Sequence, residues 1–215
     1  MQLKKRIAII GAGLSGLVLN AKLKDIADIS IYEKSRGLGG RLAQRRTENS
    51  AFNHGAPFIT ARSKAFKSLL RSLMLEKHAA VWNPRVVTIE TGKANFKRLW
   101  FEDHFVGLPG MNQIVKALLG EANIQCNTKI NTLQQNELGR WTLNTEDGAL
   151  PPTFDWVIST APAPQSATLL PRSFADFAEL EQVEMTSTYA LMVRLLGKPH
   201  FSWEAAVVRN SPLRW

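Results

Sequence analysis

The spacing of three glycines, Gly11, Gly13 and Gly16, is the feature of this sequence that most directly suggests chemistry. In the pattern Gly-x-Gly-x-x-Gly, the first glycine permits a sharp turn and the second lets the backbone approach a pyrophosphate. The third lets a helix pack closely on a strand. An acid, Glu33, follows at the interval of about 20 residues expected for a ribose-binding carboxylate. These four residues predict a dinucleotide-binding site.

The elements around these residues support the same interpretation. An apolar run at 7–10 precedes the glycines, an amphipathic run follows at 17–23, and a second apolar run at 29–32 ends on Glu33. This order predicts a strand, a tight turn, a helix and a second strand. The same glycine spacing also fits any tight strand-to-helix turn, but the flanking elements and the acid favour dinucleotide binding.

The start of the predicted helix is expected to contact the cofactor through its backbone. A helix N-terminus offers unpaired N–H groups and the positive end of its dipole to phosphates. Ala12, Leu14 and Ser15 therefore join the glycines as predicted cofactor-binding residues. A carboxylate at Glu33 would repel a 2′-phosphate, so the motif predicts FAD or NAD rather than NADP.

The acid is followed directly by the segment Lys34-Ser35-Arg36-Gly37-Leu38-Gly39-Gly40-Arg41. This segment resembles the glycine-rich loop of the flavin amine-oxidase superfamily, where the loop wraps the FAD pyrophosphate and its arginine faces the phosphates. The resemblance selects FAD and implies cofactor-binding roles for Lys34, Gly39, Gly40 and Arg41. Glycines permit close backbone approach and arginine supplies a planar charged fork. Taken alone, the segment would also fit a flexible basic loop.

A second family-like stretch covers residues 52–62. It resembles the renalase-type branch of the flavin amine oxidoreductases, in which this stretch runs beside the isoalloxazine ring. The resemblance implies that Gly55, Ala56, Pro57 and Phe58 contact the flavin. Pro57 stands where the branch usually has glutamine, and it lacks both a side-chain donor and a backbone N–H. His54 fits either an acid–base role near neutral pH or a structural role, and the structural role is the commoner one.

Two later stretches, 106–114 and 155–165, also resemble this family, which re-enters its FAD domain with a Gly-x-Pro-Gly-Met turn. By the same resemblance, Ile130 provides a backbone contact to adenine. Ala161 follows a buried strand and is expected to face the adenosine side of FAD. No metal-binding residues are predicted, and no catalytic acid or base is assigned.

Elsewhere the pattern predicts helices at 63–78 and 111–119, strands at 124–130 and 189–193, a hairpin turning near 91–93, and a meander around 141–148. Three aromatic residues of the hairpin region could wall a planar substrate or lie in the core: Trp100, Phe101 and Phe105.

The resemblance implies an α/β fold with a Rossmann-like FAD-binding domain of the glutathione-reductase type. This domain is expected in residues 1–61 and 104–165, interleaved with a partial α+β substrate domain in 62–103 and 166–215. Family members continue past the position matching Trp215, so we expect a fold that is incomplete at its C-terminus. Because a sheet lacking a strand exposes unpaired backbone groups, weak FAD affinity is expected of this chain alone.

Composition sets the broad class of the protein. The 215 residues carry a formal net charge of +9, but the basic residues are dispersed and accompany no nucleic-acid motif. We therefore expect a basic solvated surface rather than nucleic-acid or membrane binding.

Cys126 is the only cysteine, which excludes an intrachain disulfide. Residues 1–21 imitate a secretory signal, but the glycine motif within them favours a strand and a cytoplasmic location.

The predicted function is an FAD-dependent oxidoreductase that acts on a small molecule. By resemblance, a hydride passes from a dihydronicotinamide-type substrate or an amine to flavin N5, and oxygen reoxidises the flavin. Two alternatives remain at this point. One is a non-catalytic remnant with weak or no binding of FAD or ADP, and the other is an NAD-dependent dehydrogenase, which the Gly-Gly-Arg loop disfavours.

Overall fold

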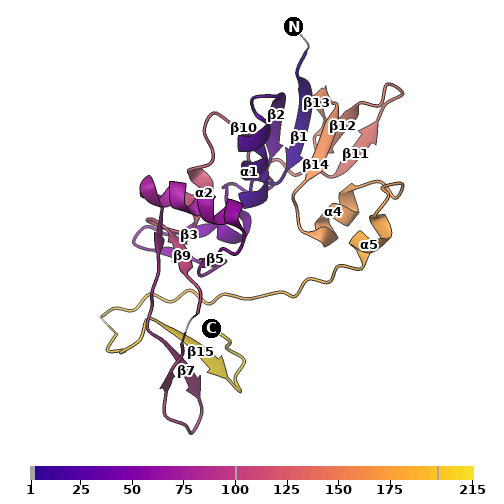
Figure 1. Ribbon diagram of the computed structural model, residues 1–215. Helices are drawn as coiled ribbons and strands as arrows, with labels where there is room; N and C mark the ends of the chain where they lie inside the picture. Colours follow the sequence, from indigo (N-terminus) through magenta and orange to yellow (C-terminus); the bar gives the residue numbers. More distant parts are fainter. Residues whose placement is uncertain (1–2, 100, 198) are drawn as a thin grey trace.

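The computed structural model describes residues 3–99, 101–197 and 199–215; Trp100 lies outside them. Its centre is a four-stranded parallel sheet in the order β10–β2–β1–β14 (Figure 1). The strands are β1 Lys5–Ile10, β2 Ala27–Tyr32, β10 Asn123–Gln125 and β14 Trp156–Ser159, and helix α1 Leu14–Leu23 joins the first two. The predicted strand–turn–helix–strand unit is therefore present.

Strand β1 is buried on both faces of this sheet. Ile7 and Ile9 belong to a core cluster with residues of α1 and of α3 Asn112–Lys116. Ala8 and Ile10 belong to a second cluster that contains Leu143. The second cluster lies under the predicted antiparallel meander, formed by β11 Thr132–Gln135, β12 Trp141–Thr145 and β13 Gly148–Phe154. An apolar run without alternation is what a parallel strand covered on both faces requires.

A second group of elements lies beside the carboxyl ends of the parallel strands (Figure 1). Helix α2, Lys64–Leu75, confirms the helix expected at 63–78, and Ser63 caps it by accepting a hydrogen bond from Phe66 N at 3.2 Å. The other elements are the hairpin β3 Gln44–Arg46 and β4 Ala51–Asn53, and the antiparallel sheet of β5 Ile59–Thr60, β9 His104–Gly107 and β6 Ala79–Val81.

A further sheet joins distant parts of the chain. Strands β7 Val86–Glu90 and β8 Phe96–Lys97 form the predicted hairpin, and β15 Ala205–Arg209 pairs parallel to β7. The two helices that precede β15 in the chain are α4 Ala163–Leu169 and α5 Phe177–Glu181. No described helix is long and apolar enough to span a membrane.

The strand predicted at 189–193 is wrong. The described residues between α5 and β15 form a long extended connection without helix or strand (Figure 1). Within it Tyr189 is 96% exposed and Leu191 is 84% exposed. Strand-forming side chains alone do not make a strand, because a strand needs a neighbour to take its hydrogen bonds.

Two other predicted elements are shorter than expected. Helix α3 covers Asn112–Lys116 rather than 111–119, and the strand expected at 124–130 ends at Gln125. After β10 the chain turns at Asn127, where φ is 54°, and its next amides bond to the carbonyls of Ser35 and Glu33 instead. Of the three aromatic residues, Phe105 is buried in the core and Phe101 is 92% exposed.

Candidate dinucleotide-binding site

A cleft of about 880 Å³ opens at the carboxyl ends of β1, β2 and β14. Ligands of open parallel sheets bind at this edge. Twelve of the 17 residues that the sequence predicts for the cofactor line this cleft: Gly11, Gly13, Leu14, Ser15, Glu33, Lys34, Gly39, Gly40, Arg41, Ala56, Ile130 and Ala161.

The three glycines of the turn have different structural roles. Gly11 has φ of 107°, a conformation that disfavours other residues, and a Cβ there would lie 2.8 Å from Thr160 Oγ1. A Cβ on Gly16 would overlap the Gly11 carbonyl group. By contrast, a Cβ on Gly13 would meet no atom within 4 Å. Gly11 and Gly16 are therefore needed by the fold itself, whereas Gly13 keeps space free in the cleft.

Helix α1 points its N-terminus at the same space. Gly13 is its N-cap residue, no side chain caps the helix, and its first turn carries no acid. The first intrahelical bond at this end is donated by Leu17 N to Gly13 O at 3.1 Å. The amides of Leu14 and Ser15, which line the cleft, belong to the first turn and have no intrahelical acceptor. This arrangement suits an anion such as a pyrophosphate.

Glu33 connects the end of β2 to the glycine turn. Its Oε2 accepts a hydrogen bond from Ala12 N at 2.9 Å, and its Oε1 accepts one from Ser35 N at 2.8 Å. The side chain is buried, and each carboxylate oxygen still has capacity for a second donor. Glu33 therefore fixes the turn and can still receive ribose hydroxyl groups.

The second glycine segment lies directly against the first. Gly39 N donates to Ala12 O at 3.0 Å, and Gly13 and Gly39 form a parallel bridge. Gly39 and Gly40 have φ of 124° and 52°, so both conformations favour glycine. The segment then enters the short 3₁₀ helix η1, Gly40–Leu42. The close approach of the two backbones explains why this loop contains paired glycines.

Arg41 supplies positive charge to the cleft. Its side chain is exposed, it lines the cleft, and it has no ion pair with any described residue. Its carbonyl accepts a hydrogen bond from Ala56 N at 2.8 Å, which brings the 52–62 stretch to the cleft. A Cβ on Gly55 would overlap that carbonyl group, so Gly55 supports this junction from outside the cleft.

The opposite side of the cleft is formed by residues that return from distant positions. Thr128 N donates to Glu33 O at 2.9 Å, which places Ile130 at the cleft. Lys34 Nζ donates to Gln165 Oε1 at 3.0 Å, which links the loop after β2 to helix α4. Burial raises the pKa of the nearby Cys126 thiol, and the Glu33 carboxylate raises it further.

Five predicted residues do not line the cleft: Ala12, Gly16, Gly55, Pro57 and Phe58. The first three position the lining residues, as described above. Phe58 instead packs against other aromatic rings, with its centroid 4.2 Å from that of His104. His54 is exposed and also lies away from the cleft. The cofactor contacts predicted for Pro57 and Phe58 stay predictions.

Sequence reasoning missed Thr128, Thr160 and Gln165, which all line the cleft. Thr160 Oγ1 lies 3.0 Å from Ile10 O and 3.1 Å from Gly11 O, and so fixes the end of β14 to the glycine turn. Thr128 lies outside the family-like stretches, whereas Thr160 and Gln165 lie within 155–165, where only Ala161 was predicted to contact the cofactor. Only the strand order of the sheet brings them together.

The fold and the cleft together define a Rossmann-type dinucleotide-binding protein. Comparison with protein families agrees, because residues 9–73 match the family described as NAD(P)-binding Rossmann-like domain. Residues 93–212, more than half of the chain, match the family described as flavin containing amine oxidoreductase. The protein belongs to this flavin-containing family. The family and the dinucleotide-binding fold confirm the prediction of FAD as the cofactor.

Two solved structures share this fold. The crystal structure of a putative protoporphyrinogen oxidase from Exiguobacterium sp. 255-15 has a TM-score of 0.64 at 16% identity, over 85% of this chain and 64% of that one. A triple mutant of putrescine oxidase, redesigned in its cofactor binding, has a TM-score of 0.61 at 14% identity, over 83% and 62%. The chain therefore spans less than two thirds of either protein. These similarities support the predicted α/β fold.

Proposed function

We propose that this protein is an FAD-dependent oxidoreductase of the renalase-like type. Its substrate would be a small reduced molecule, either a dihydronicotinamide-type compound or an amine. Membership in the flavin-containing family supports the general class. The stretches 52–62 and 155–165, which resemble the renalase-like branch, support the finer assignment. A cytoplasmic location and the predicted domain boundaries stay predictions.

The residues of the cleft fit the parts of FAD. The amides at the start of α1 and the Arg41 guanidinium would hold the pyrophosphate. Glu33 would accept hydrogen bonds from the ribose, and Ile130, which lines the cleft, would contact the adenine. When bound, FAD would supply N5 as the hydride acceptor, with oxygen as the proposed final electron acceptor. The protein's part is to bind, to orient the substrate and to exclude water.

The observation that carries this proposal is the empty space at Gly13. This position lies between the N-terminus of α1 and the second glycine segment, and a side chain there would project into the cleft. Its φ of −83° is available to any residue. A larger residue at position 13 should therefore block the ligand without straining the backbone.

The test compares Gly13→Val with Gly37→Val by titrating each purified protein with FAD and following flavin fluorescence. Gly37 is a matched control, because it is exposed, a Cβ there meets no atom within 4 Å, and it does not line the cleft. We expect Gly13→Val to weaken FAD binding at least about a hundredfold, the cost of displacing the pyrophosphate from several charge-assisted hydrogen bonds. Gly37→Val should bind like the wild type.

Equal FAD affinity in both variants would place the cofactor elsewhere and contradict the proposal. The chemical step is tested separately by mixing FAD-loaded protein anaerobically with a dihydronicotinamide dinucleotide or with a primary amine. Loss of the yellow flavin colour with one compound identifies the substrate class. Binding of FAD without bleaching by either compound would favour the non-catalytic alternative.

A further inference from the structure

A second cavity, of about 810 Å³, lies beside α2 and shares no lining residue with the dinucleotide cleft. Neighbouring residues from β5 into α2 are divided between the linings of the two spaces. Ile59 and Phe66 line the cleft, whereas Ala61, Arg62 and Lys67 line the second cavity. Cavities of this size hold small organic ligands. The proposed flavin chemistry makes no use of this cavity.

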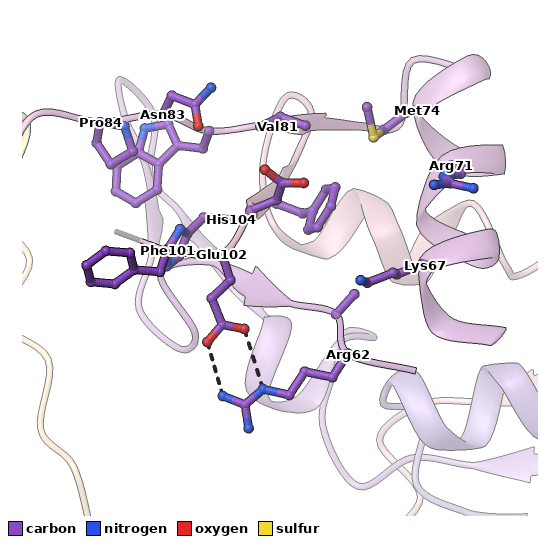
Figure 2. Close-up of a pocket in the computed structure, with 14 residues that line it drawn as sticks. Arg62, Lys67, Arg71, Met74, Val81, Asn83, Pro84, Phe101, Glu102 and His104 are labelled. Atoms are coloured by element: carbon purple, nitrogen blue, oxygen red, sulfur yellow. Dashed lines mark hydrogen bonds and ion pairs between the residues drawn. The ribbon is translucent and has the colours of Figure 1, made fainter. Parts of the chain in front are cut away.

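One wall of this cavity is a row of side chains along α2. Lys67, Arg71 and Met74 are spaced i, i+4 and i+7, so they share one face of the helix. Figure 2 shows Lys67 extending from α2 toward the middle of the cavity, with Arg71 and Met74 further along the same helix. Neither Lys67 nor Arg71 has an ion pair within the described part of the chain.

A third cation at the cavity is already neutralised. Arg62 donates to both carboxylate oxygens of Glu102, from Nη2 at 3.1 Å and from Nε at 3.4 Å (Figure 2). This hydrogen-bonded pair keeps the pKa of Glu102 below its ordinary value. The lining therefore holds three cations and two acids, the second acid being Asp103, and counting histidine as neutral it has one excess positive charge. That excess suits a monoanion.

The opposite wall offers flat apolar surface. Trp82 and Phe101 line it, and the Trp82 ring packs against Phe58 with a centroid separation of 6.0 Å. The backbone of Trp82 is also held, because its N donates to His104 O at 2.7 Å. An immobilised indole is a preorganised surface for a planar ring.

We propose that this second cavity binds an aromatic carboxylate. The ring would lie against Trp82, and the carboxylate would reach Lys67 and the guanidinium of Arg71, whose fork matches carboxylate geometry. A protonated amine would be disfavoured by the same two cations. The site is separate from the flavin cleft, and the proposal does not depend on which substrate the flavin oxidises.

The test uses isothermal titration of the full chain with naphthoate and with naphthamide, its neutral analogue of nearly equal shape. We expect saturable naphthoate binding with a Kd at or below about 1 mM, the affinity that ordinary ligand efficiency gives a molecule of this size. The amide should bind at least about tenfold more weakly, since it lacks the charge. Equal binding of the two compounds, or no saturable naphthoate binding, would overturn the proposal.

Two variants and one control assign the site. Replacing both cations, in Lys67→Gln with Arg71→Gln, should weaken naphthoate binding at least about tenfold and leave naphthamide within about twofold. Lys64→Gln removes one positive charge from an exposed position of α2 outside the cavity, and should change the binding of neither compound. Trp82→Ala should weaken both compounds. Saturating FAD should leave naphthoate binding unchanged, and competition between them would show that naphthoate binds in the dinucleotide cleft instead.

Discussion

Oε2 of Glu33 accepts a hydrogen bond from the Ala12 amide, 21 residues earlier in the chain, over 2.9 Å. The same carboxylate that should contact the ribose therefore also holds the glycine turn in place. Its second oxygen, Oε1, is bonded to Ser35 N. Cofactor binding and local stability consequently depend on one side chain.

Replacement of Glu33 by glutamine should lower both stability and FAD affinity. The amide oxygen of glutamine can accept from Ala12 N or from Ser35 N, but the amide nitrogen then faces the other N–H. Leaving one buried donor unsatisfied costs about 1–3 kcal/mol in the free energy of unfolding. Urea denaturation measures this, with Glu48→Gln as an exposed control. An unchanged free energy would show that the carboxylate does not hold the turn.

The second prediction concerns Gly16, which the helix–strand packing requires, and Gly13, which keeps space free in the cleft. Gly16→Ala should destabilise the protein by about 1–3 kcal/mol or more, because its Cβ overlaps the Gly11 carbonyl group. Gly13→Ala should leave stability within about 0.5 kcal/mol, the usual range for changes without steric conflict, and should still weaken FAD binding. Thermal melts followed by circular dichroism distinguish them. Equal melting temperatures for the two variants would refute the assignment of roles.

The variant Arg41→Gln, which removes the positive charge, should weaken FAD binding roughly tenfold to a hundredfold. This is the affinity that one charge-assisted hydrogen bond contributes. Arg41→Lys should recover only part of this affinity, since an ammonium lacks the planar fork. Arg36 is exposed and lies in the same loop, outside the cleft lining, so Arg36→Gln is the matched control. If Arg41→Gln and Arg36→Gln lost equal affinity for FAD, the loss would reflect the net charge of the loop rather than a contact made by Arg41.

The pairing of β15 with β7 should depend on pH through Glu204. Arg85 contacts both Glu204 carboxylate oxygens with its side chain and donates its backbone N to Oε2 at 2.6 Å. These bonds hold the pKa of Glu204 below its ordinary value of 4.5. Their contribution is thus complete above that value and is lost as the pH falls through the lower, folded pKa.

Hydrogen exchange of the β15 amides measures this effect. Protection of Ala205–Arg209 relative to the central sheet should fall on acidification, and Glu204→Gln should show the reduced protection already at neutral pH. Protection that is unaffected by pH and by the substitution would show that the strand is held by other contacts.

The sequence predicts those parts of the site in which the backbone itself, through its conformation or its packing, restricts which residues fit. Gly11 and Gly16 are recognisable because a backbone φ of 107° at Gly11 and the carbonyl group that approaches Gly16 both strongly favour glycine. The strand at 7–10 is equally recognisable, since a strand buried on both faces is a continuous apolar run. The strand at 29–32 is interrupted by Ser30 but ends on the buried side chains of Ile31 and Tyr32.

The residues that could not be predicted depend on tertiary partners. The family-like stretch 155–165 predicts a cofactor contact at Ala161, but Thr160 and Gln165 join it in the cleft only because β14 pairs with β1, and no local pattern encodes that pairing. The strand expected at 189–193 was wrong for the same reason. Its composition fits a sheet, but no neighbouring strand takes its hydrogen bonds among the described residues.

Strand β1, which is buried on both faces, and the exposed connection after α5 should differ in how easily they unfold locally. Regions with few buried contacts unfold locally at little cost, whereas core strands open only with the whole molecule. The glycine turn is attached to the end of β1 and to β14, both in the central sheet. A protease that nicks the chain near Tyr189 should therefore leave the cofactor cleft assembled.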